Sequence, residues 1–179
     1  MYKLIVLDRD GVINQDSPTY IKSPEEWHAI PGSIEAIAKL HRHGYKVVVA
    51  TNQSGIARGY FTQNTLDAMH KKMLDQIEAA GGHIEDIFIC PHGPEDGCEC
   101  RKPKSGLLLQ AANKFNISPS EMLIIGDSIR DILAAKNYGA TAIFIKTSNK
   151  NDDLLAAKSA GVSVYASLAE AVDYITNKI

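Results

Sequence analysis

Residues 4–11 read Leu-Ile-Val-Leu-Asp-Arg-Asp-Gly, so four apolar residues are followed at once by two carboxylates, Asp8 and Asp10. Because a charge is costly to bury, we expect both carboxylates to face a cleft where a buried strand ends. Gly11 lets the chain turn sharply at that point. The stretch therefore predicts a β-strand that delivers two acidic side chains to a site.

Short apolar runs alternate with amphipathic helical patterns along the rest of the chain. Strands are expected at residues 3–7, 46–50, 84–89, 122–125 and 141–145, and helices at residues 34–43, 64–80, 106–115 and 128–138, with more of both towards the end. Pro31, Gly32 and Ser33 are expected to supply a turn and an N-cap for the first helix. The alternation predicts an α/β fold: a Rossmann-like parallel sheet with helices on both faces and ligands bound at the carboxyl ends of the strands.

The length and composition predict a single globular domain over residues 1–179. Hydrophobic residues make up 45% of the chain and charged residues 22%, values typical of soluble domains. The net charge is −2, from 19 basic and 21 acidic residues, so no basic surface for nucleic acid is expected. The apolar runs are too short to span a bilayer, and no signal-peptide pattern opens the sequence. We therefore expect a cytoplasmic monomer without a nucleic-acid or membrane partner.

Polar residues also follow the later strands. Asp127 and Asp131 add carboxylates after the fourth strand, and clustered carboxylates favour a hard cation such as Mg²⁺. The run 51–55, Thr-Asn-Gln-Ser-Gly, offers hydroxyl, amide and backbone donors for phosphate oxygens. Arg101, Lys102 and Lys104 supply cations in the loop after the third strand. Each feature alone is common in caps, turns or solvated patches, but together they suit phosphoryl transfer.

The motifs at residues 8–14, 51–55, 100–103 and 126–128 resemble, in this order, those of the haloacid-dehalogenase phosphatases, and the resemblance covers nearly the whole chain. It implies a haloacid-dehalogenase-like fold in which Asp8 is the nucleophile that forms an aspartyl-phosphate. Asp10 would act first as the general acid and then as the base. Thr51 and Lys102 would stabilise the transferring phosphoryl group, with Lys104 as the alternative lysine.

The same resemblance implies a catalytic Mg²⁺ held by Asp8, the backbone carbonyl of Asp10, and Asp127. Asp131 is expected to orient a neighbour rather than to bind the metal. No large cap domain is expected, because one helix and one strand fill the segment between Thr51 and Cys90.

The three cysteines lie within residues 90–100, and the set Cys90, His92, Cys98 and Cys100 is a complete tetrahedral ligand set for Zn²⁺. Four protein ligands close the site, so the zinc would be structural and would staple the loop that leads to Arg101 and Lys102. The alternative is three incidental thiols and a surface histidine.

With its zinc loop, the chain resembles two related branches of the family, the D-glycero-D-manno-heptose 1,7-bisphosphate 7-phosphatases and the histidinol-phosphate phosphatases; residues 51–59 are closer to the first. The resemblance implies release of the 7-phosphate in ADP- or GDP-heptose (lipopolysaccharide core) synthesis, or, alternatively, hydrolysis of histidinol phosphate in histidine synthesis. A polynucleotide 3′-phosphatase and a phospho-acceptor signalling domain are weaker alternatives. The residues expected to bind a small sugar phosphate are Asp16, Tyr20, Asn52, Gln53, Ser54 and Arg101.

Overall fold

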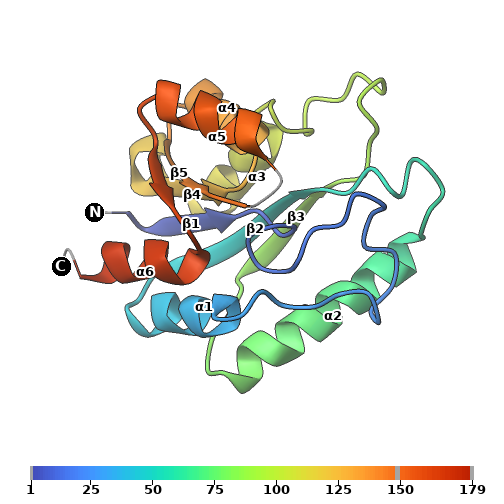
Figure 1. The fold of residues 1–179 in the computed structure, drawn as a ribbon, viewed down its shortest axis with the longest axis horizontal. Coiled ribbons are helices and arrows are strands. Elements are labelled where there is room, and N and C mark those ends of the chain that lie inside the picture. Colours follow the sequence, from blue (N-terminus) through green and yellow to red (C-terminus); the bar gives the residue numbers. More distant parts are fainter. Residues whose placement is uncertain (1, 148–149, 178–179) are drawn as a thin grey trace.

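A computed structural model describes residues 2–147 and 150–177, which form one parallel sheet flanked by helices (Figure 1). The strands, β1 to β6, lie in the order β3-β2-β1-β4-β5-β6. Their bounds are Leu4–Leu7 (β1), Lys46–Asn52 (β2), Asp86–Cys90 (β3), Met122–Gly126 (β4), Thr141–Ile145 (β5) and Ser163–Tyr165 (β6). The helices are Ser33–Arg42 (α1), Gln63–Ala79 (α2), Gly106–Phe115 (α3), Ile129–Tyr138 (α4), Asn151–Ser159 (α5) and Leu168–Thr176 (α6), with a short 3₁₀ helix at Pro119–Glu121.

Helices cover both faces of the sheet, as the sequence predicts. In Figure 1, α1, α2 and α6 lie on one face, and α3, α4 and α5 on the other. Ile5 and Leu7 of β1 are buried in the core of the first face, whereas Leu4 and Val6 are buried in that of the second. Because successive side chains of a strand point to opposite faces, a strand buried on both sides has to be apolar throughout.

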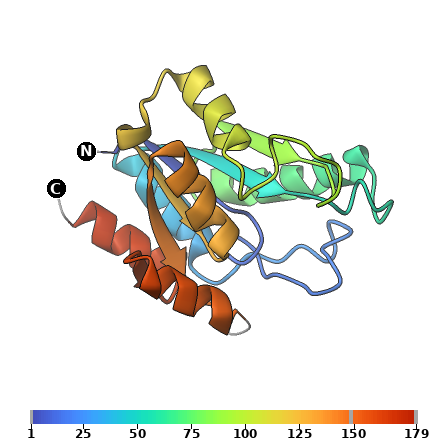
Figure 2. The same cartoon turned by 90° about the horizontal axis from the view of Figure 1, so that it is seen from above.

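The strand order sets the position of the site. β1 pairs with β2 on one side and with β4 on the other, both in parallel. The loops that leave these three strands therefore emerge side by side, at the position where ligands bind in open parallel sheets. In Figures 1 and 2 the loops after β1, β2 and β3 gather at one end of the molecule.

The element boundaries differ from the sequence-based ranges by one or two residues, and one cap differs in kind. Gly32, not Ser33, precedes α1 as its N-cap residue, and no side chain caps the helix. The Ser33 hydroxyl instead donates a 2.7 Å hydrogen bond to the carbonyl of Ile13, which ties α1 to the loop after β1. The segment 31–33 therefore contains the N-cap residue, as predicted, but this residue is Gly32 and the serine bonds elsewhere. No helix in the described ranges is long and apolar enough to cross a bilayer.

Trp27 lies in the long loop between β1 and α1 and is fully buried. Trp27→Ala should lower the free energy of unfolding by about 3–5 kcal/mol, because it removes a large side chain from a packed core. The measurement is chemical denaturation. Leu155→Ala is the matched control, since Leu155 is 62% exposed, and it should change stability by less than about 0.5 kcal/mol. If both substitutions lowered the free energy of unfolding equally, burial of Trp27 would not be what stabilises this loop.

Candidate active site

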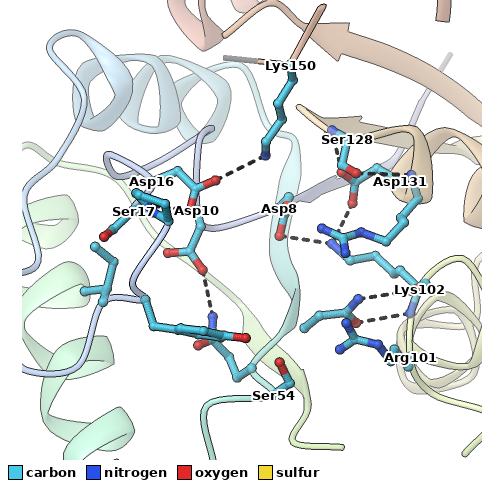
Figure 3. A pocket seen from close by; sticks show the side chains of 16 residues that line it. Asp8, Asp10, Asp16, Ser17, Ser54, Arg101, Lys102, Ser128, Asp131 and Lys150 are labelled. Carbon is cyan, nitrogen blue, oxygen red and sulfur yellow. Dashed lines mark hydrogen bonds and ion pairs between the residues drawn. The ribbon is translucent and has the colours of Figure 1, made fainter. Parts of the chain in front are cut away.

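Asp8 stands at the centre of the site, directly after β1 (Figure 3). Its backbone N–H donates to the carbonyl of Ile125 at 2.9 Å, so the sheet pairing continues through the residue and fixes its backbone. One carboxylate oxygen, Oδ1, lies 3.0 Å from Nζ of Lys102. Burial raises the pKa of Asp8 to about 6, even though Lys102 opposes the shift.

Lys102 is buried, and its ammonium contacts two carboxylates and one carbonyl. Besides Asp8, Nζ donates to Asp131 Oδ1 at 2.6 Å and to the carbonyl of Ala50 at 2.7 Å. Burial alone would lower the pKa of Lys102, but the charges of Asp131 and Asp8 raise it above its usual value. Lys104 is exposed and pairs with Glu99 at 2.7 Å. The structure therefore places Lys102, and not Lys104, beside Asp8.

The backbone around Lys102 is held by the end of β2. Asn52 accepts from the N–H of Lys102 and donates to its carbonyl, both at 3.1 Å. Asn52 also pairs in the sheet with Cys90, at the start of the cysteine loop. The preceding residue, Arg101, donates to the carbonyl of His92 at 3.2 Å. The loop after β3 is thus attached to β2 at both of its ends.

Asp10 is surrounded by donors. Its Oδ1 accepts from Arg9 Nη2 at 3.0 Å and from Asn14 Nδ2 at 2.9 Å, and its Oδ2 accepts from Gln53 Nε2 at 2.9 Å. Burial raises the pKa of Asp10, but the Arg9 charge and these hydrogen bonds outweigh it, so the pKa lies below its usual value.

Arg9 is a residue that the sequence analysis did not single out. It is buried, and its Nη1 lies 3.2 Å from Nε2 of His70. Burial, together with the Arg9 charge, lowers the pKa of His70 to about 4, so a neutral imidazole accepts this bond. A basic residue between two aspartates was the only sequence signal for this pairing with Asp10.

The carboxylates of Asp8, Asp127 and Asp131 converge, with one oxygen of each within 4.8 Å of the others. Burial, followed by the charge of Asp8, raises the pKa of Asp127 to about 7. Asp127 Oδ1 is buried and has no hydrogen-bond partner among the described residues. An unpartnered oxygen inside a carboxylate cluster fits a hard divalent cation such as Mg²⁺. The carboxylate of Asp10 is not part of the cluster, which leaves its backbone carbonyl as the group predicted to face the metal.

Two glycines allow these carboxylates to approach the backbone. Gly11 has φ +81°, and a Cβ there would collide with the carboxylate of Asp127. A Cβ at Gly126 would collide with the side chain of Asp131. Any side chain at either position would displace a member of the carboxylate cluster.

A cavity of about 260 Å³ opens over Asp8 and Asp10. All six residues predicted to bind substrate line it: Asp16, Tyr20, Asn52, Gln53, Ser54 and Arg101. Thr51 does not line it; its buried hydroxyl accepts from Gln53 Nε2 at 2.9 Å. The phosphoryl-stabilising role of Thr51 stays a prediction.

The rim of the cavity is partly aromatic. Tyr20 adopts φ +69°, and its ring lies edge-on to Tyr60 with the centroids 5.0 Å apart. The guanidinium of Arg58 lies 6.0 Å from the centre of the Tyr20 ring. Lys150, another residue without a sequence signal, reaches over the carboxylate cluster, with Nζ 2.6 Å from Asp127 Oδ2.

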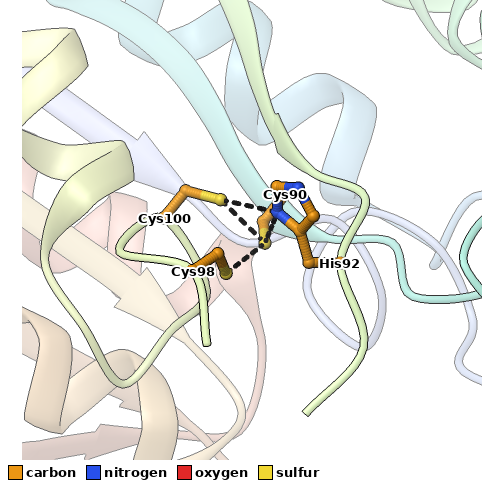
Figure 4. Close-up of side chains that lie close together, drawn as sticks. All are labelled: Cys90, His92, Cys98 and Cys100. Carbon is orange, nitrogen blue, oxygen red and sulfur yellow. Dashed lines mark hydrogen bonds between the residues drawn. The ribbon is translucent and has the colours of Figure 1, made fainter. Parts of the chain in front are cut away.

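The cysteine–histidine group is assembled as predicted (Figure 4). The Sγ atom of Cys90 lies 3.7 Å from that of Cys98 and 3.0 Å from that of Cys100. His92 Nδ1 lies 3.2 Å from Cys100 Sγ. Zn–S bonds of about 2.3 Å in a tetrahedron separate the sulfurs by roughly 3.7 Å, the separation found for Cys90 and Cys98. One ligand atom from each of the four side chains lies within 4.8 Å of the others, so the group is compatible with a structural Zn²⁺.

The family models and the curated relatives that match this chain agree with one another. Residues 5–83 match the haloacid dehalogenase-like hydrolase family model, and residues 99–171 match a second, HAD-hydrolase-like model. The D-glycero-beta-D-manno-heptose-1,7-bisphosphate 7-phosphatase of Bordetella bronchiseptica is 49% identical over 147 residues, 82% of each chain. The enzyme of that name from Pseudomonas aeruginosa is 50% identical over 144 residues, 80% of this chain and 81% of its own.

Among solved structures, D,D-heptose 1,7-bisphosphate phosphatase from B. bronchiseptica, crystallised with magnesium and phosphate, superposes with a TM-score of 0.94. The two chains are 43% identical, and the match covers 99% of each.

Cys98→Ser should lower both the zinc content and the stability of the protein, because the serine hydroxyl is a poor replacement for a thiolate ligand. We expect the melting temperature to fall by roughly 5–10 °C, the shift that a loss of about 2–3 kcal/mol gives at this chain length. Elemental analysis and thermal unfolding are the measurements. Glu95→Gln changes an exposed residue of the same loop and should keep its zinc. A Cys98→Ser protein that retains one zinc per chain would remove Cys98 from the ligand set.

Proposed function

The chain belongs to the D-glycero-beta-D-manno-heptose-1,7-bisphosphate 7-phosphatases, a branch of the haloacid dehalogenase-like hydrolases, and we propose that it releases the 7-phosphate of that heptose bisphosphate. The observation that carries the mechanism is the position of Asp8, with Lys102 Nζ 3.0 Å from Oδ1 and the unpartnered Oδ1 of Asp127 in the same carboxylate cluster. A nucleophile held between a fixed cation and a cation-binding cluster suits attack on a phosphoryl group.

In the first step, a carboxylate oxygen of Asp8 forms a bond to phosphorus as the bond to the sugar oxygen breaks. With a pKa of about 6, Asp8 is mainly ionised near neutral pH and ready to attack. The Lys102 ammonium is oriented by Asp131 and Ala50 towards the same place, and it balances negative charge on the transferring group. The product of this step is an aspartyl-phosphate and a sugar alkoxide that needs a proton.

Asp10 donates that proton as a general acid and then acts as a general base. The donors Arg9, Asn14 and Gln53 stabilise its ionised form in the free enzyme. A phosphate dianion bound nearby opposes this, because like charge favours the protonated form, and the carboxyl group can then protonate the leaving oxygen. The resulting carboxylate takes a proton from water, whose oxygen attacks phosphorus and releases phosphate from Asp8.

Asp8, the backbone carbonyl of Asp10, and Asp127 would hold the catalytic Mg²⁺. When bound, the ion neutralises the carboxylate cluster and the negative charge on the phosphoryl oxygens. Asp131 keeps a different role in this proposal, since its two oxygens accept from Lys102 at 2.6 Å and from the N–H of Ser128 at 3.1 Å.

The rest of the substrate would occupy the cavity lined by Asp16, Tyr20 and Arg101. We propose that residues 1–179 act as one catalytic domain, with zinc fixing the loop that carries Arg101 and Lys102. The monomeric state, the cytoplasmic location and the place of the product in lipopolysaccharide-core synthesis stay predictions. The two relatives described above carry the heptose name, which favours this substrate over histidinol phosphate.

The test is phosphate release from heptose 1,7-bisphosphate and from histidinol phosphate by the purified protein with magnesium. We expect kcat/KM for the bisphosphate to exceed that for histidinol phosphate by at least roughly 100-fold, since a second phosphate adds charge-assisted contacts. A preference for histidinol phosphate would move the protein to the alternative branch of the family. If the protein hydrolysed neither compound, the proposed substrate would be wrong.

Asp8→Asn should reduce turnover by at least about 1,000-fold, because an amide is not a nucleophile that can form the aspartyl-phosphate. The substitution preserves shape, so thermal unfolding should show a folded protein. The measurement is phosphate release under saturating substrate, together with trapping of phosphorylated enzyme. Phosphorylation that persists in the Asp8→Asn protein would place the nucleophile elsewhere.

Asp10→Asn should slow both chemical steps, by roughly 100- to 10,000-fold for a leaving group that needs protonation. With a substrate whose leaving group is a good one, such as p-nitrophenolate, the first step no longer needs the acid. We therefore expect the phosphoenzyme to form and then to accumulate in the variant. Rapid-quench kinetics measure both steps, and an unchanged rate of dephosphorylation would exclude Asp10 as the base.

A further inference from the structure

Lys150 lies directly before α5 and bridges two carboxylates that belong to different parts of the site. Figure 3 shows its contact with one of them, Asp16. Its Nζ lies 2.6 Å from Asp127 Oδ2 in the carboxylate cluster and 3.2 Å from Asp16 Oδ2 at the edge of the cavity. Its side chain is 24% exposed, compared with 1% for Asp127 and 43% for Asp16. The mechanism above does not use Lys150.

The other charged side chains named in the mechanism are paired with one another. Asp8 and Asp131 share the ammonium of Lys102, and Asp10 is paired with Arg9. Within the described ranges, the cation in contact with Asp127 is Lys150, and it occupies one oxygen only.

A divalent cation on the free oxygen of Asp127 would sit on the same carboxylate as the Lys150 ammonium. The ion and the ammonium are both positive, and like charges bound to one carboxylate repel strongly inside a protein. Lysine has a long flexible stem and an ammonium that donates in any direction, so it can give up one carboxylate for another. Asp16 already contacts the same Nζ and is open to solvent.

We propose that Lys150 is a positioning residue that links the metal site to the substrate entrance: it is the counter-cation of Asp127 in the metal-free enzyme and shifts to Asp16 when Mg²⁺ binds. The shift leaves Asp127 to the metal. It also strengthens the Lys150–Asp16 pair, and Asp16 lines the cavity together with Tyr20. Metal binding would therefore help to fix the segment that we propose to receive the sugar, a consequence that rests on the proposed function.

The first test is calorimetric titration of the metal-free protein with MgCl₂ at one pH. Lys150→Met keeps the apolar stem and removes the charge, and it should bind Mg²⁺ roughly tenfold more tightly, because a competing cation is gone. Lys150→Arg keeps the charge and should stay within about threefold of the wild type. The matched control is Lys146→Met, an exposed lysine of the same loop, which should leave affinity unchanged. Unchanged or weaker Mg²⁺ binding by folded Lys150→Met would overturn the proposal.

The second test is a double-mutant cycle with Asp16→Asn. Without Asp16 the ammonium has only Asp127, so Asp16→Asn should weaken Mg²⁺ binding by roughly threefold or more. The same substitution in the Lys150→Met background should have much less effect. Additive effects of the two substitutions would mean that Asp16 acts on the metal independently of Lys150, and the link would be wrong.

The third test uses steady-state kinetics at saturating Mg²⁺. Lys150→Met should raise KM for heptose bisphosphate by roughly fivefold and change kcat by less than about twofold, because Lys150 positions the entrance and not the reacting atoms. An unchanged KM would remove the link to the entrance. Should the wild type not hydrolyse this substrate, the proposed function fails, while the magnesium cycle still decides the role of Lys150.

Discussion

The site depends on the contacts that the buried Lys102 ammonium makes with two carboxylates and a carbonyl. The ammonium lies between Asp8 and Asp131 and also contacts the carbonyl of Ala50, so it joins the ends of β1, β2 and α4 through one charged group. A buried lysine without these acceptors would be costly, and the carboxylates without the lysine would repel one another. Because the lysine and the carboxylates stabilise one another, Asp8, the proposed nucleophile, is held in place before any substrate binds.

The parts of the site that lie far apart in the sequence are brought to Lys102 by short connections. Asn52 binds both the N–H and the carbonyl of Lys102, and its sheet partner is Cys90. The four predicted zinc ligands lie within eleven residues, 90–100, and this loop contains no helix or strand after Cys90. An ordered metal-binding loop next to Lys102 reduces the conformational entropy that substrate binding would otherwise have to remove.

Local patterns were enough to predict the fold and to single out residues that the structure brings together; the roles of these residues stay predictions. The apolar run before Asp8 and the compact spacing from Cys90 to Cys100 each have few alternative explanations, and the structure brings the residues of each together. Arg9 and Lys150 were not predicted, because a lone basic residue has no pattern and its partner is set by the tertiary fold. Nor did the sequence show which of residues 31–33 is the N-cap: it is Gly32, because the Ser33 hydroxyl has a distant acceptor in Ile13 that the local sequence does not reveal.

The glycines beneath the carboxylate cluster have a consequence for the size of the ion that the cluster accepts. Asp127 rests against the backbone of Gly11, and Asp131 rests against that of Gly126, so neither carboxylate can retreat without moving a strand end. Of the two, Asp127 is the proposed metal ligand, and a ligand held in this way disfavours the longer bonds and the seven or eight ligands that Ca²⁺ adopts and suits the short octahedral bonds of Mg²⁺. Two positions that carry no side chain, Gly11 and Gly126, thus set how closely these carboxylates approach the ends of the strands.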